Sequence, residues 1–226
     1  MSGRPVVVLD LDGVIVKSNL VKYKAMLAMF ADYPDKLAAV DAYILGNGGV
    51  ARRDKLVEIL ESIVGVEATQ ARLTQYLEQY AKNLEISLAA APLVEGVKEF
   101  IARGNHAFYV SSTAPEKEVR EQLARNDLLH CFIKVYGGCT PKAIALSEIS
   151  DRHAGQEVVF FGDSLGDLDA ARATGVAFVG VRNERDNFMG LDVVKLDAFD
   201  SPESVENVML AAIRVRSNAS TRGREL

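Results

Sequence analysis

The sequence predicts an α/β fold: an open, doubly wound parallel sheet of Rossmann-like type, with an inserted domain made only of helices. Two observations support this prediction. Short continuous apolar runs alternate with amphipathic helical patterns over most of the chain, and such runs are typical of strands buried on both faces of a parallel sheet. The alternation stops between about Leu20 and Ala91, where helical patterns occur without a convincing strand. We therefore expect a second, smaller domain there.

The apolar runs predict five strands and a weaker sixth one. In chain order they are Val6 to Leu11, Ala107 to Ser111, Ile133 to Tyr136, Glu157 to Gly162, Val176 to Val181 and, weakest, Val193 to Leu196. Three of the helices between them have proline near the start, where its missing N–H costs nothing. We expect the first of these helices to begin near Pro92 and to end at Gly104. The second should begin at Pro115, and the third at Pro141 with Thr140 as its cap.

The helical insert follows the first strand directly. Its stretch "RRDKLVEILESIV" repeats Leu56, Leu60 and Ile63 on one helical face. Small or polar residues flank it, "VKSN" at one end and "SLAAAP" at the other, and these suit two hinge segments. We expect a core at 1–18 and 92–216, a helical cap at 19–91 that serves as a lid, and a disordered tail at 217–226, which lacks apolar periodicity.

The composition limits the function. With 226 residues, 49% of them hydrophobic, a net charge of −5 and a pI near 5.3, the chain predicts a globular protein that binds neither nucleic acid nor a membrane surface. Cys131 and Cys139 form no CxxC pair, which argues against structural zinc and fits a reducing cytoplasm. We expect no secretory signal and no membrane span, since no run of about 18 apolar residues exists.

Polar side chains follow the predicted strands at their carboxyl ends, where open parallel sheets bind ligands. These side chains are Asp10 and Asp12 after the first strand, Ser111 and Ser112 after the second, Lys142 after the third, and Asp163 and Asp167 after the fourth. Individually each has a structural explanation. The serines suit helix caps, and acids are favoured at helix starts. Together, in the right order on the right elements, they predict a site.

The residue types of this site are consistent with phosphoryl transfer. A cluster of Asp10, Asp163 and Asp167 would repel itself without a cation, and oxygen-only ligands favour a hard ion such as Mg²⁺. Asp10 and Asp12 lie two residues apart, on one side of a strand, so one carboxylate can attack phosphorus while the other moves a proton. Mg²⁺, Ser111, Lys142 and backbone N–H groups near Gly13 can meet the charge of the transferred group.

At these residues the sequence resembles the haloacid dehalogenase superfamily of phosphohydrolases and contains all four of its motifs in order. "DLDGV" at 10–14 is similar to the first motif and "VSS" to the second. Lys142 is similar to the third, and "GDSLGDLDAARATG" to the fourth. The resemblance extends from Val6 to about Val181, and the helical insert lies where that family has its helical cap.

The resemblance implies a role for each residue. Asp10 is then the nucleophile, Asp12 the general acid and base, and Ser111 and Lys142, with the neighbouring Ser112, bind phosphate. Mg²⁺ is held by the Asp10 side chain, the Asp12 main-chain carbonyl and Asp163, with Asp167 in support. The reaction implied is hydrolysis of a small phosphomonoester through an aspartyl phosphate.

Several alternatives remain open. Dehalogenases and phosphonate-cleaving members lack the acid found here at Asp12, so both are disfavoured. A β-phosphoglucomutase-like activity is second to a phosphatase, because that enzyme shares Asp-x-Asp-Gly-Val, but its cap histidine would fall at Lys22. Outside the family, a receiver-type phosphoacceptor switch would also carry an acidic pocket with Mg²⁺, and a catalytically silent binding protein could keep the fold. The large insert, Asp12 and the intact acids argue against both.

Substrate choice is expected to depend on the cap. The segment "LGNGGVARRDKL" places Arg52 and Arg53 at the start of a predicted helix, where an arginine could bind a carboxylate or sugar group. A solvated helix start is the structural alternative. The expected partner is a small phosphorylated metabolite: a phosphoglycolate-like acid, a sugar phosphate or a nucleotide.

Overall fold

The computed structural model describes residues 3–47, 50–103, 105–183 and 186–222. The chain divides into two compact units, one formed by Met1–Lys17 with Leu93–Leu226 and the other by Ser18–Pro92. The boundaries that we expect for core and cap differ from this division by one residue.

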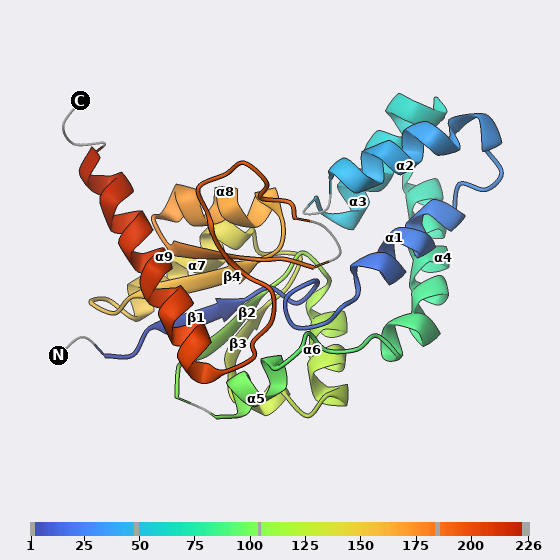
Figure 1. Ribbon diagram of the computed structural model, residues 1–226. Coiled ribbons are helices and arrows are strands. Elements are labelled where there is room, and N and C mark those ends of the chain that lie inside the picture. The colour runs from blue at the N-terminus through green and yellow to red at the C-terminus, as the bar shows by residue number, and fades with distance from the viewer. Residues whose placement is uncertain (1–2, 48–49, 104, 184–185, 223–226) are drawn as a thin grey trace. The chain divides into compact units, whose positions relative to one another are not determined.

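The first unit is built on a parallel sheet with the strand order β3-β2-β1-β4-β5-β6 (Figure 1). The strands are β1 (Val6–Leu9), β2 (Phe108–Ser111), β3 (Phe132–Tyr136), β4 (Val158–Gly162), β5 (Ala177–Val181) and β6 (Val194–Leu196). Each of the six predicted strands is present, although β1 ends two residues early. The order reverses beside β1, as in a doubly wound sheet. The predicted fold class is confirmed.

Helices cover both faces of this sheet (Figure 1). They are α5 (Val97–Ala102), α6 (Glu116–Arg125), α7 (Lys142–Arg152), α8 (Leu165–Thr174) and α9 (Pro202–Arg222). On one face, α7 and α8 bury Leu146 and Leu168 against Val8 and Phe160 of the strands. On the other face, Phe100 of α5 packs edge-on against Phe108, with their ring centroids 5.4 Å apart. This burial on both faces explains the continuous apolar runs.

Four helix boundaries differ from the prediction. The helix expected near Pro92 begins at Val97, because Gly96 takes a left-handed φ of 73° and a Cβ there would lie 2.1 Å from the Phe199 carbonyl oxygen. Gly104, the predicted end, lies outside the described residues. Helices α6 and α7 begin at Glu116 and Lys142, each one residue after the predicted start, with Pro115 and Pro141 as their caps.

The C-terminal segment is the fourth difference. Helix α9 continues to Arg222, so the prediction of a disordered tail is wrong for 217–222; residues 223–226 lie outside the described ones. The Arg216 guanidinium pairs with the Glu157 carboxylate at 2.8 Å, which attaches this end of α9 to the start of β4. Among the residues that the structure describes, no helix is long and apolar enough to span a membrane.

The second unit is helical throughout its described part. It contains α1 (Asn19–Ala28), the 3₁₀ turn η1 (Pro34–Lys36), α2 (Leu37–Gly46), α3 (Arg52–Glu58), the π-helical turn η2 (Ile59–Val64) and α4 (Gln70–Ala89). Leu56 and Leu60, from the predicted apolar face, are fully buried in a core of this unit's own, and Ile63 packs against its edge. The helical pattern therefore reflects burial within this unit.

Candidate active site

Asp10 follows β1 directly and begins a tight turn. Its Oδ1 accepts a hydrogen bond from the Leu11 N–H at 2.7 Å, and the residue is only 5% exposed. The turn is closed by the Gly13 N–H, which donates to the Val16 carbonyl at 2.8 Å, and Gly13 has a φ of 74°. Glycine is favoured at such an angle. The half-buried Asp12 therefore stands in the same turn as Asp10.

Lys142, the first residue of α7, links two of the acids. Its Nζ donates to Asp10 Oδ2 at 2.7 Å and also pairs with Asp167 Oδ1. The Lys142 side chain is 9% exposed. Burial alone would lower its pKa, but the charges of Asp10 and Asp167 outweigh burial and raise the pKa above its ordinary value. Lys142 is therefore a permanent cation at the carboxyl ends of the strands.

Asp167 also has a structural role. It belongs to a capping box at the start of α8, where Ser164 is the cap. Its Oδ2 accepts from the Ser164 hydroxyl at 2.7 Å and from the Ser164 N–H at 3.0 Å. Its other oxygen pairs with Lys142. The helix-start explanation and the site explanation therefore both hold for this residue.

Asp10, Asp163 and Asp167 form one buried cluster, in which one carboxylate oxygen from each lies within 4.8 Å of the other two. Burial raises the pKa of Asp10 well above its usual range; Lys142 opposes this shift, and the neighbouring acids add to it. Lys142 pairs with two of these three acids, and every candidate ligand atom is an oxygen. This donor set fits a hard divalent cation, which would lower the cost of ionising Asp10.

The two serines after β2 differ in their surroundings. Ser111 is fully buried, and within the described part of the chain its Oγ has no hydrogen-bond partner. A buried hydroxyl without a partner costs about 1–3 kcal/mol, so this atom is suited to meet a ligand. Ser112 Oγ instead accepts from the Ala114 N–H at 3.1 Å and holds the turn after β2. The phosphate-binding role of Ser112 stays a prediction.

Two residues near the site were not predicted. Asn183 Nδ2 donates to Asp163 Oδ2 at 2.9 Å, and Asn187 Nδ2 donates to the Asp163 carbonyl oxygen at 2.8 Å. Both lie in the segment after β5. The stretch "VRNERDNF" carries a signal for them, because polar residues at the carboxyl end of a parallel strand are candidates for a site, but it does not show which atoms they contact.

Arg52 and Arg53 begin α3, as predicted, and belong to the Ser18–Pro92 unit. The Arg52 guanidinium lies 4.4 Å from the centre of the Tyr80 ring, and Arg53 donates to Gln70 Oε1 at 2.9 Å. Each arginine thus has a contact inside its own unit. Their role in substrate choice stays a prediction.

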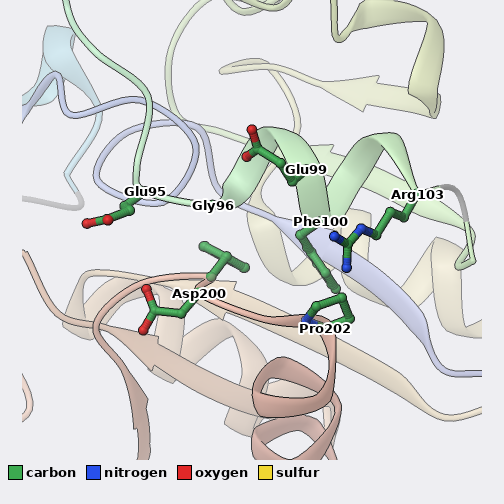
Figure 2. A pocket seen from close by; sticks show the side chains of 8 residues that line it. Glu95, Gly96, Glu99, Phe100, Arg103, Asp200 and Pro202 are labelled. Carbon is green, nitrogen blue, oxygen red and sulfur yellow. The ribbon is translucent and has the colours of Figure 1, made fainter.

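A hollow on the core unit shares no residue with this site. It lies between the start of α5 and the segment leading into α9 (Figure 2). Acidic Glu95, Glu99 and Asp200 line it together with Arg103 and the Phe100 ring. It offers no paired lysine or buried acid comparable to those around Asp10.

Comparison with known proteins agrees with this geometry. A family model described as haloacid dehalogenase-like hydrolase matches residues 7–181. Phosphoglycolate phosphatase 1 of Pseudomonas aeruginosa is 30% identical over 183 residues, which are 75% of this chain and 66% of that protein. The structure of a predicted phosphoglycolate phosphatase from Haemophilus somnus has a TM-score of 0.69 at 20% identity, with 91% of this chain and 99% of that one covered. The structure of β-phosphoglucomutase from Clostridium difficile has a TM-score of 0.68 at 17% identity, with 92% of this chain and 98% of that one covered. The match over residues 7–181 confirms the resemblance seen in the four motifs, and the chain belongs to the haloacid dehalogenase-like hydrolase family.

Proposed function

We propose that this protein is a Mg²⁺-dependent phosphatase that hydrolyses a small phosphomonoester through an aspartyl phosphate on Asp10. The observation that carries the proposal is the grouping of Asp10 with Asp163 and Asp167, in which Lys142 is bound to Asp10. The buried Ser111 hydroxyl, which has no hydrogen-bond partner among the residues that the structure describes, adds a donor at the end of the neighbouring strand β2. The family membership and the phosphatase relative support the same reaction.

In the first step, an Asp10 carboxylate oxygen attacks phosphorus. The new bond joins that oxygen to phosphorus, and the bond from phosphorus to the ester oxygen breaks. Asp12 gives its proton to the departing oxygen, which leaves as an alcohol. Gly13 closes the turn that holds both acids, so the nucleophile and the proton donor stand in one turn of the chain.

In the second step, Asp12 acts as a base. Its carboxylate takes a proton from water while the water oxygen attacks phosphorus, and the bond from phosphorus to Asp10 breaks. Inorganic phosphate leaves and both acids return to their starting states. Lys142 and the Ser111 hydroxyl stabilise the negative charge on the phosphoryl oxygens in both steps.

The residues that would hold Mg²⁺ are the side chains of Asp10 and Asp163, the main-chain carbonyl of Asp12, and Asp167 in support. When bound, the ion supplies positive charge that offsets the phosphoryl group and the clustered acids. The three side chains of this ligand set form the buried cluster, and the Asp12 carbonyl is added because the family motif implies it.

For the substrate we propose a small phosphorylated metabolite, with phosphoglycolate as the first compound to test because the Pseudomonas relative is a phosphoglycolate phosphatase. Arg52 or Arg53 would bind its carboxylate. A mutase is the second candidate, supported by "DLDGV" at 10–14. The product separates the two: a phosphatase releases inorganic phosphate, and a mutase forms an isomeric sugar phosphate.

Hydrolysis of p-nitrophenyl phosphate with and without Mg²⁺ tests the proposal. We expect turnover only with Mg²⁺, its loss in Asp10→Asn, and wild-type activity in Asp169→Asn, which changes an exposed acid of the same helix as Asp167. Turnover by Asp10→Asn, or none by the wild type with Mg²⁺, would show that the proposal is wrong.

A further inference from the structure

Two asparagine side chains from the segment after β5 hold Asp163 at two different atoms. Asn183 donates to the carboxylate Oδ2 at 2.9 Å, and Asn187 donates to the main-chain carbonyl at 2.8 Å. Asp163 itself is 8% exposed and follows β4 directly. One asparagine therefore acts on the side chain of Asp163, and the other on its backbone.

The segment that carries these amides is anchored in the core. Phe188 is fully buried and packs edge-on against Phe178, with ring centroids 5.5 Å apart. Gly180 leaves room for it, since a Cβ there would lie 2.6 Å from Phe188 Cδ2. Asp186 accepts from the Phe188 N–H at 2.9 Å and from Lys195 Nζ at 2.8 Å. These contacts anchor the chain next to Asn187, and Asn183 lies two residues after the end of β5.

The chemistry of the contact suits a cation ligand. A buried carboxylate is costly to ionise, and a hydrogen bond to the charged form lowers that cost. The amide of Asn183 gives this support without a positive charge that would repel a cation. Lys142 serves Asp10 and Asp167 differently, because it brings a full charge. Groups that hydrogen-bond to metal ligands tune metal affinity by about 10–100-fold.

We propose that Asn183 is a positioning residue that orients the Asp163 carboxylate for the divalent cation, while Asn187 holds the backbone that presents it. The inference rests on the proposed function, because it takes Asp163 as a metal ligand. Asn183 then acts on metal affinity through the carboxylate, and Asn187 acts through the position of the chain.

Calorimetric titration of Mg²⁺ into the substrate-free protein tests this proposal. Asn183→Ala removes the donor, and Asn183→Leu removes it at nearly constant size. We expect the Kd for Mg²⁺ to rise about tenfold or more in both, and Asn183→Ser, which keeps a donor, to recover part of the affinity. Asn126→Ala is the matched control: its Nδ2 donates to the Gln122 carbonyl at 2.9 Å at the end of α6, and its loss should leave the Kd unchanged.

The activity measurement adds a second readout. In the Asn183 variants we expect the Mg²⁺ concentration for half-maximal turnover to rise, with most of kcat regained at saturating Mg²⁺. A purely structural role would lower the unfolding midpoint of the metal-free protein and leave the Kd of the folded fraction as in the wild type. That outcome would overturn the inference. If Asn183→Ala does not fold, the Kd for Mg²⁺ of Asn183→Leu tests the inference instead. If the wild type itself binds no Mg²⁺, the proposed function fails first.

Discussion

The ammonium of Lys142 donates to Oδ2 of Asp10 at 2.7 Å, although the two residues are 132 positions apart in the sequence. This contact joins the end of β1 to the start of α7, and the pairing with Asp167 extends it to α8. A single buried ammonium thus pairs with one acid at the end of β1 and another in the first turn of α8.

Lys142→Met removes the cation and leaves two buried acids without it. Losing one partner of a buried ion pair costs about 3–5 kcal/mol, so the free energy of unfolding in urea with a metal chelator should fall by about that amount at neutral pH. Phosphatase activity should be lost as well. Lys134→Met removes an exposed lysine that pairs with Glu148 at 3.3 Å, and it should change neither property appreciably. An unchanged stability of Lys142→Met would contradict the assigned pairing.

The raised pKa of Asp10 predicts a pH dependence of Mg²⁺ binding. The cation needs the ionised carboxylate, so its affinity should increase as the pH rises from the usual Asp value of 3.8 through the raised pKa. Metal binding should release protons within that range, which calorimetry in buffers of different ionisation enthalpy measures. Proton release that is the same in Asp10→Asn as in the wild type would count against Asp10 as its source.

The same raised pKa has a consequence for the metal-free protein. A carboxyl group that holds its proton more tightly when folded contributes stability at low pH, and this contribution is lost as the pH rises through the folded-state pKa. The free energy of unfolding in chelator should therefore fall over this range in the wild type and fall less in Asp10→Asn. Urea titrations at successive pH values measure the difference, and identical slopes for the two proteins would refute it.

Ser111 and Ser112 should behave differently when changed to alanine. Ser111→Ala removes a buried hydroxyl that has no partner in the described structure, so stability should stay level or rise while inhibition by inorganic phosphate weakens. Ser112→Ala removes the bond to the Ala114 N–H and should lower stability by about 1 kcal/mol. Urea unfolding of both variants measures the two changes in stability, and their inhibition by inorganic phosphate measures the effect on phosphate binding. Unchanged phosphate inhibition in Ser111→Ala would remove this serine from the phosphate site.

The cap arginines predict a change in substrate preference. If Arg52 or Arg53 binds the substrate carboxylate, its change to alanine should raise KM for phosphoglycolate and leave KM for p-nitrophenyl phosphate, which has no carboxylate, unchanged. Arg72→Ala, in α4 of the same unit, is the control. Equal effects on both substrates would assign the arginines to cap structure, through the Tyr80 and Gln70 contacts.

Much of the fold could be predicted because its elements are local. The strands β1, β2, β4 and β5 are visible as apolar runs because every one of their residues is buried, whereas β3 and β6 are only partly buried. Lys142 is visible because proline marks the start of its helix. The failures depend on distant contacts. The late start of α5 reflects the approach of Gly96 to Phe199, and α9 extends to Arg222 where Arg216 meets Glu157. No local pattern contains either contact.

The site divides in the same way. The acids and the lysine could be predicted because parallel strands bring their carboxyl ends to one edge, where Asp10, Asp163 and Asp167 cluster. The hydrogen bonds from Asn183 and Asn187 to Asp163 could not be predicted, since they join residues from two different strand ends. The fully buried, unpartnered state of Ser111 is likewise a property of the packed structure.

Trapping of the phosphoenzyme tests the central claim most directly. Asp12→Asn lacks the base for the second step, while p-nitrophenolate leaves with little help from an acid, so a phosphoryl group should accumulate on this variant. Acid quenching, borohydride reduction of the acyl phosphate and peptide mass spectrometry locate it. We predict homoserine at position 10 when Mg²⁺ is present, and none in the Asp10→Asn, Asp12→Asn double variant. Reduction at any other residue, or turnover without a trapped intermediate, would contradict the assignment of Asp10 as the nucleophile.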